Sequence, residues 1–193
     1  MSEIFYDVNT NITQENIRKE IEIITTVFKE VSIRIFFHAG TLLSAIRDKN
    51  FIPYNNDYDF GIFRAEITAD MREQIIQKLI NNKFILRELK RQSYPVFKLY
   101  APYTHCNTDF FIFEKRENDY YHGSWKGYHY FLKETLDNLD ESEFMGLKIL
   151  IPHNPELFLE YMYGKDWKTP KKMKKPDDYC NWTKELKNGG VND

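Results

Sequence analysis

The feature that most constrains this chain is a pair of aspartates, Asp57 and Asp59, at the head of an apolar run that continues to Phe63. The run is predicted to form a β-strand, and because side chains alternate between the faces of a strand, both carboxylates are expected on the same face. Carboxylates so close repel one another, and the usual remedies are a shared proton or a divalent cation. Oxygen ligands in this pattern favour Mg²⁺ or Mn²⁺, the ions that accompany phosphates. The pair therefore predicts a site of phosphoryl transfer.

A Gly-Thr turn precedes the pair and joins a predicted strand over residues 33–37 to a predicted short helix over residues 41–47. Glycine lets the backbone pass close to a ligand, and the first amides of a helix are unpaired donors. Gly40 and Thr41 are therefore candidates for binding phosphate, and the alternative is a plain strand-to-helix turn that Thr41 caps. Arg47 has a guanidinium suited to bidentate phosphate contact, with a surface salt bridge as its alternative.

The chemistry needs a third carboxylate, and Asp109 is the best candidate because it is the one charge that opens the apolar run of residues 108–113. On the residues alone, this position is as typical of a turn former at a strand edge. Glu114 is the nearest rival, but its odd offset from Asp109 places it on the opposite face. Lys98, alone in the apolar run of residues 96–100, is a candidate for binding phosphate or for an ordinary salt bridge.

Apolar periodicity predicts two amphipathic helices, one that Thr13 caps and one that begins at Thr68 or Asp70. A third, short helix is predicted from Asn154-Pro155, with the asparagine as N-cap. Because several strands are adjacent in the sequence, an α+β chain with a mixed sheet is expected. Strands are predicted over residues 84–89, 96–100 and 108–113.

The five histidines form no zinc-binding pattern. His38 ends the strand before Gly40, so it is expected either to border the pocket or to pack in the core. The other histidines are expected in loops or at the surface: His105, His122, His129 and His153.

A single compact domain over residues 1–193 is predicted, because 193 residues are short for two independent cores. A hydrophobic content of 42% argues against disorder. The net charge of -2 gives no general attraction to nucleic acid, so no nucleic-acid partner is expected. No apolar run approaches membrane-spanning length and the N-terminus has no signal-peptide core, so a cytoplasmic location is expected.

Residues 171–193 are predicted to be a lysine-rich flexible tail, part of a basic cluster that begins at Lys165. Such a cluster is usually a solvated segment. The alternative is contact with an anionic lipid-linked acceptor or membrane surface, which would make the protein membrane-associated.

Two blocks of the sequence resemble the LicD/fukutin-type nucleotidyltransferase family. Residues 37–60 are similar to the family pattern G-T-L-L-G-x-x-R, a short gap, then I-P-W-D-x-D-x-D. Residues 146–170 are similar to its second signature, a strand that ends in Pro, a short helix and a Y-G-x-D-W-like turn. The chain departs from the pattern at four positions, with Ser44 for glycine, Tyr54 for tryptophan, and Asn55 and Asn56 for acidic residues.

The resemblance implies the nucleotidyltransferase (DNA polymerase β-like) fold, a mixed sheet flanked by helices mainly on one face. The family's third acid lies at a D-[IF]-F position, which supports Asp109 as the partner of Asp57 and Asp59 in catalysis and in holding Mg²⁺ or Mn²⁺. The implied reaction moves an alcohol phosphate, such as phosphocholine or ribitol phosphate, from a CDP-activated donor to a glycan hydroxyl. Two alternatives stay open: release of pyrophosphate from an NTP, and a catalytically dead relative that binds nucleotide or glycan.

Overall fold

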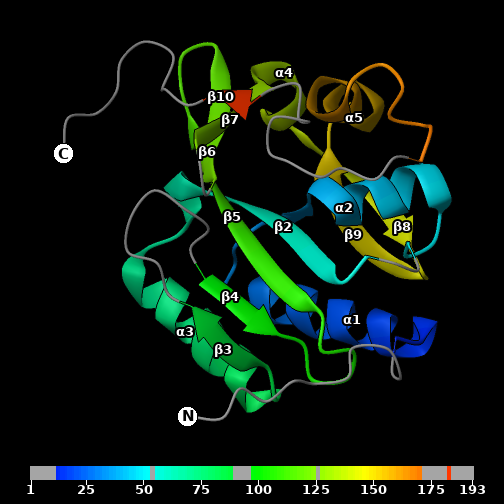
Figure 1. Cartoon of the computed structure of the whole chain (residues 1–193). Helices are drawn as coiled ribbons and strands as arrows, with labels where there is room; N and C mark the ends of the chain where they lie inside the picture. The colour runs from blue at the N-terminus through cyan, green and yellow to red at the C-terminus, as the bar shows by residue number, and fades with distance from the viewer. Residues whose placement is uncertain (1–11, 53–54, 89–96, 125–126, 171–181, 184–193) are drawn as a thin grey trace.

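A computed structural model describes residues 12–52, 55–88, 97–124, 127–170 and 182–183. The described strands form an eight-stranded sheet and a separate two-stranded hairpin (Figure 1). The strands in chain order are β1 (Ile35–Phe37), β2 (Asp57–Phe63), β3 (Ile85–Glu88), β4 (Phe97–Tyr100), β5 (Asn107–Lys115), β6 (Asp119–Ser124), β7 (Gly127–Leu132), β8 (Leu139–Phe144), β9 (Leu147–Pro152) and β10 (Trp182–Thr183).

The α-helices are α1 (Gln14–Glu30), α2 (Ala39–Leu43), α3 (Ala69–Asn81), α4 (Lys133–Leu136) and α5 (Pro155–Tyr163). One turn of π-helix, η1 (Ser44–Asp48), continues α2, and a 3-10 turn, η2 (Arg64–Glu66), follows β2. Two caps agree with the sequence prediction, since the Thr13 and Thr68 side chains accept from the amides of Asn16 and Met71, each at 3.2 Å. Pro155 begins α5 as predicted, but Asn154 makes no side-chain cap.

The large sheet runs in the order β1-β2-β5-β6-β7-β10, and β4 pairs with β5 and with β3. β2 and β5 pair in parallel, whereas every other pairing among the described strands is antiparallel. The sheet is therefore mixed, as predicted. β5 is long enough to pair with β4 at its beginning and with β6 at its end.

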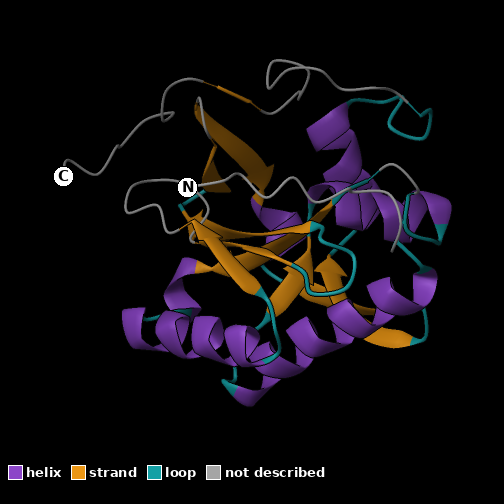
Figure 2. Cartoon of the chain, turned by 60° about the horizontal axis from the view of Figure 1, so that its bottom comes forward, coloured by secondary structure: helices purple, strands orange, loops and turns teal. Residues whose placement is uncertain are grey.

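The long helices α1 and α3 lie together beneath one face of the sheet, and α2 lies against the other face of β2 (Figures 1 and 2). Stacked aromatic rings join α1 to the middle of the sheet. The Phe110 ring centroid lies 5.2 Å from that of Phe28 on α1, 5.5 Å from that of Phe60 and 4.5 Å from that of Phe97. This stack sets the distance between α1 and the strands β2, β4 and β5.

His122 and His129 are buried, with only 3% and 5% exposed, so the expectation of loop or surface positions was wrong for them. They lie opposite each other on β6 and β7, where strand alternation turns both rings inward. His38 is also buried, with its ring centroid 5.1 Å from that of Phe111 and 5.0 Å from that of His122. Burial, followed by the charges of the other two histidines, lowers its pKa well below the usual range. His38 therefore packs in the core.

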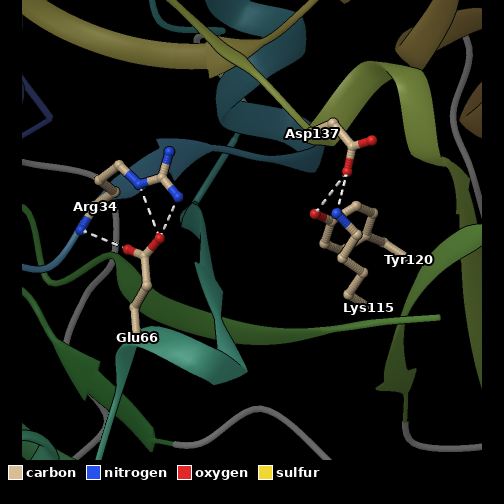
Figure 3. A network of polar contacts seen from close by, with 5 residues as sticks. All are labelled: Arg34, Glu66, Lys115, Tyr120 and Asp137. Carbon is tan, nitrogen blue, oxygen red and sulfur yellow. Dashed lines mark hydrogen bonds and ion pairs between the residues drawn. The ribbon is translucent and has the colours of Figure 1, made fainter. Parts of the chain in front are cut away.

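Two groups of polar contacts, neither of which includes the aspartates of the candidate site, connect elements of the fold (Figure 3). The Arg34 amide and Nε, just before β1, donate to the Glu66 carboxylate in η2 at 3.2 and 2.8 Å. Lys115 and Tyr120 both donate to Asp137 Oδ1, at 2.6 and 3.1 Å. The predicted tail, residues 171–193, lies outside the described residues except for β10, which pairs with β7.

Replacing Gly61 by alanine is expected to destabilise the fold by about 1–3 kcal/mol, because a methyl group there would lie 2.1 Å from the Phe36 ring. Urea unfolding at equilibrium measures the change. Phe36→Leu supplies a matched control, since the smaller side chain makes room for the methyl group. The double variant should lose less than the sum of the two single changes. Strictly additive losses would show that the Phe36 ring is not what excludes a side chain at this position.

Candidate active site

The site is built on the parallel register of β2 and β5, in which Asp59 lies beside Asp109 and Asp57 beside Asn107. Tyr58 and Phe60 face α1, so the alternating residues Asp57 and Asp59 point to the opposite face, as predicted. The three predicted carboxylates therefore share one face at the beginning of two neighbouring strands.

Each carboxylate already has a protein partner. Asp59 Oδ2 accepts from the Gly40 amide at 3.1 Å, and Asp57 Oδ1 accepts from Asn107 Nδ2 at 2.7 Å. Asp109 Oδ2 forms an ion pair with Lys98 Nζ. Asp109 Oδ1 is buried and has no hydrogen-bond partner in the described part of the chain.

The Gly40-Thr41 turn holds Asp59 in place. Besides the contact from the Gly40 amide, the buried Thr41 hydroxyl accepts from the Asp59 backbone amide at 2.8 Å. A Cβ on residue 40 would lie 3.3 Å from Asp59 Oδ2 and 3.0 Å from Asn55 Nδ2. A glycine is therefore suited to this close approach of α2 to β2. Direct binding of phosphate by the turn stays a prediction.

Asn55, at a position where the family pattern has an acid, braces the start of β2. Its Nδ2 donates to the Asp57 carbonyl at 3.0 Å, and its Oδ1 accepts from the Asp57 amide at 3.4 Å. A carboxylate could not donate the first of these bonds. In this geometry the Asn55 side chain holds the backbone of Asp57.

Two other candidates have polar partners other than the three carboxylates. Arg47 Nε donates to its neighbour Asp48 at 2.9 Å, and only 13% of the arginine side chain is exposed. Its binding of phosphate stays a prediction. Glu114, the rival third acid, accepts from the Tyr121 hydroxyl at 2.6 Å where β5 pairs with β6.

The electrostatics show a cluster that is short of positive charge. Burial, followed by the charges of Asp57 and Asp109, raises the pKa of Asp59 well above its usual range. Burial also raises the pKa of Asp109, although the charge of Lys98 opposes the shift. Both carboxylates would be stabilised by a further cation.

The donor set suits a hard divalent cation, because three carboxylates share one face and Asp109 has a buried oxygen without a hydrogen-bond partner. The described residues nevertheless contain no group of three or more His, Cys, Asp or Glu side chains arranged to hold a metal ion as they stand. Lys98 occupies one oxygen of Asp109. A metal at this site therefore requires these side chains to rearrange.

The sequence prediction missed a buried carboxylate on the other face of the sheet. Glu20 on α1 accepts from the hydroxyls of Tyr58 and Thr104, each at 2.7 Å, and from the Thr104 amide at 2.9 Å. The signal was present, because Glu20 lies three residues after Ile17 and four before Ile24 on the apolar stripe of the helix. A charged residue in that stripe indicates a buried polar contact.

A family model described as LicD/FKTN/FKRP, nucleotidyltransferase domain, matches residues 32–154, more than half of the chain. The chain therefore belongs to the LicD/FKTN/FKRP nucleotidyltransferase family, as its two sequence blocks predicted. The matched region contains α2, β2, β4 and β5, the elements that carry the candidate residues.

Relatives named ribitol-5-phosphate transferase FKTN, from Homo sapiens and Macaca fascicularis, are each 26% identical to the chain over 82% of its length and 34% of their own. A protein of Rickettsia typhi named as uncharacterized is 26% identical over 64% of this chain and 38% of that protein. The chain thus spans about a third of the length of the curated relatives it matches.

Two structures of ANT(2'')-Ia resemble the fold. The solution structure of this antibiotic-resistance factor has a TM-score of 0.53 and 11% identity, covering 80% of this chain and 74% of that one. The crystal structure in complex with adenylyl-2''-tobramycin has a TM-score of 0.50 and 12% identity, covering 80% and 78%. These likenesses bear out the predicted α+β nucleotidyltransferase fold. None of the helices in the described ranges has the length and apolar character that crossing a bilayer requires.

Asp59→Asn is expected to stabilise the metal-free protein at neutral pH, raising its Tm by roughly 2–4 °C for each 1 kcal/mol of repulsion and desolvation removed. Because the folded-state pKa of Asp59 is raised, the wild type loses stability as the pH rises from the usual value of 3.8 through the folded pKa. The gain should therefore vanish below that usual value. Thermal melts across pH, with chelator present, measure it. A gain equally large at acid pH would contradict an electrostatic origin.

Proposed function

We propose that the chain is a metal-dependent transferase that moves an alcohol-phosphate group from a CDP-activated donor to a hydroxyl of a glycan or lipid-linked glycan. The observation that carries the proposal is the convergence of Asp57, Asp59 and Asp109 on one face of the sheet in a chain of this family. Relatives named ribitol-5-phosphate transferase support a group of the polyol-phosphate or phosphocholine type. The acceptor hydroxyl would attack the distal phosphorus, and CMP would leave.

In this proposal the three carboxylates hold Mg²⁺ or Mn²⁺, which would neutralise the oxygens of the transferred phosphate. We assign Asp109 a second role, because its carboxylate would lie beside the metal and could orient or take the proton of the attacking hydroxyl. Asp109 is buried, with 8% of the whole residue exposed, which keeps that proton away from bulk water.

The donor phosphates would be bound by the groups around this cluster. The Gly40 amide and Thr41 stand at the start of α2, directly against Asp59. Lys98 supplies an ammonium beside Asp109, and Arg47 follows on the π-helical turn after α2. These cations oppose the charge that a nucleoside diphosphate brings to an acidic site.

The test is incubation with Mg²⁺ and a panel of CDP-choline, CDP-ribitol, CTP and ATP. We expect CMP from a CDP-alcohol, and a fall of at least about a hundred-fold in each of Asp57→Asn, Asp59→Asn and Asp109→Asn. Asp140→Asn is the matched control, because the Asp140 carboxylate on β8 is 44% exposed and pairs with His153.

Each outcome of this assay has a distinct meaning. Pyrophosphate from CTP or ATP in place of CMP would indicate a nucleotidyltransferase. Bound nucleotide with no turnover of any compound would favour a catalytically dead relative. Wild-type turnover in a folded Asp57→Asn or Asp59→Asn variant would remove these residues from the active site.

Asn55→Asp is expected to move the acidic limb of the activity profile to higher pH. The added charge would lie beside Asp57 and Asp59 and raise their pKa values, so a higher pH is needed to ionise them. Loss of the amide's bond to the Asp57 carbonyl should also lower stability by about 1–3 kcal/mol. Rates across pH and thermal melts measure both changes. Asn56→Asp is the control, since its side chain is exposed and water would screen the same charge. Tighter Mn²⁺ binding without a shift of the limb would instead make residue 55 a metal ligand.

A further inference from the structure

Lys98 is in direct contact with the acidic cluster of Asp57, Asp59 and Asp109, because it forms an ion pair with Asp109. The antiparallel pairing of β4 with β5 places Lys98 opposite Asp109, and the two side chains form an ion pair. The lysine side chain is 21% exposed and the aspartate side chain 11%. The lysine charge acts on both carboxylates, because it lowers the pKa of Asp59 as well as that of Asp109 against the raising effect of burial.

A second cation reaches the cluster only indirectly. Arg87 on β3 donates to Asn107 Oδ1, and Asn107 Nδ2 in turn donates to Asp57 Oδ1. The guanidinium is therefore separated from the carboxylate by one amide. Within the described residues, Lys98 forms a direct ion pair with one of the three acids, Asp109, whose Oδ1 still has no hydrogen-bond partner.

Lys98 and a divalent cation would compete for the same carboxylate. An ammonium paired with Asp109 repels a metal ion that approaches Asp59, which lies beside Asp109 in register, or Asp57, two residues earlier on the same strand. The lysine has a flexible four-carbon stem, so its charge can swing away without moving β4. A phosphate group arriving at the site offers the ammonium a new partner.

We propose that Lys98 is a resident counter-ion that holds Asp109 in the metal-free protein and passes to the donor phosphate when a divalent cation joins the three aspartates. This rests on the proposed function. Lys98 thereby couples the two binding events, because the metal binds well only when a phosphate has drawn the ammonium away. The lysine is a positioning residue that makes metal binding depend on the donor.

The competing explanation is a permanent structural salt bridge. In that case Asp109 keeps Lys98 throughout, and the metal, if bound, uses Asp57 and Asp59 without it. Removing the ammonium would then lift the same repulsion whether or not CDP is present, so CDP would change Mn²⁺ affinity by the same factor in the wild type and in the variant. The two explanations therefore differ in whether the substitution removes the effect of CDP on Mn²⁺ binding.

The experiment is titration of Mn²⁺ followed by the electron paramagnetic resonance signal of the free ion, with and without CDP and corrected for Mn²⁺ bound to CDP in solution. For the wild type, we expect CDP to tighten Mn²⁺ binding at least about ten-fold, within the usual range of coupling between sites. Lys98→Met should bind Mn²⁺ alone at least about ten-fold more tightly than the wild type, and CDP should add little further.

Four further variants sharpen the test. Lys98→Gln retains a donor for Asp109 without the charge, so it should repeat the methionine result even if Lys98→Met folds poorly. Lys98→Arg keeps the charge and should behave as the wild type, as should Lys115→Met, which removes an exposed lysine paired with Asp137. Adding Asp109→Asn to Lys98→Met should abolish the gain.

Equal or weaker Mn²⁺ affinity in folded Lys98→Met and Lys98→Gln, or an effect of CDP on Mn²⁺ binding as large in these variants as in the wild type, would overturn the proposal for Lys98 alone. No Mn²⁺ binding to any of these proteins, with or without CDP, would overturn the metal-dependent function together with it. Melting curves on the same samples show which variants are folded.

Discussion

The parallel pairing of β2 with β5 is the constraint on which the candidate site depends. It sets Asp59 beside Asp109 on one face and Phe60 beside Phe110 on the other. The phenylalanine rings stack 5.5 Å apart on the helix side, where apolar burial stabilises the sheet. Because side chains alternate along a strand, the aromatic stack that fixes the strands also holds mutually repelling carboxylates at close range. The stability of the core thus offsets the electrostatic cost of the site.

Glu20 adds a second constraint from beneath the sheet. Tyr58 stands between Asp57 and Asp59 in sequence, and its hydroxyl reaches down to Glu20 on α1. The same carboxylate accepts from Thr104, in the connection that leads into β5. A buried charge is tolerated there because several donors satisfy it. One glutamate therefore joins the starts of both strands to the helix and fixes the ends where the aspartates lie.

The spacing of residues in the sequence predicted the structural features that depend on residues close together in the chain. The shared face of Asp57 and Asp59 and the caps at Thr13 and Thr68 follow from periods of two and from helix-start chemistry. The strands β6 and β7 were not foreseen, and with them the burial of His122 and His129. Their signal was a run of aromatic residues before Gly123 and another after Gly127, a sequence pattern typical of a hairpin.

Register between strands far apart in sequence could not be predicted in the same way. Nothing in the spacing of residues 96–100 shows that Lys98 lies opposite Asp109, because a shift of one residue would turn the lysine to the other face. The contact from Asn107 to Asp57 has the same origin, since it requires β2 and β5 to be adjacent and in register. The apolar run of residues 108–113 made Asp109 the candidate third acid and the family resemblance supported it, whereas its neighbours Asp59 and Lys98 became visible only in the sheet.

The departures from the family pattern and the position of Lys98 can be understood as one balance of charge. With Asn55 and Asn56 in place of acids, the cluster contains three carboxylates, and Lys98 supplies one ammonium, which leaves a formal charge of -2 when all four are ionised. That charge equals what one divalent cation neutralises. A further acid at position 55 would lie against Asp57 without a cation of its own, and the structure instead places there an amide that donates to the backbone. The amide at residue 55 and the lysine at residue 98 therefore act in the same direction. Both limit the repulsion among aspartates that the sheet holds close together.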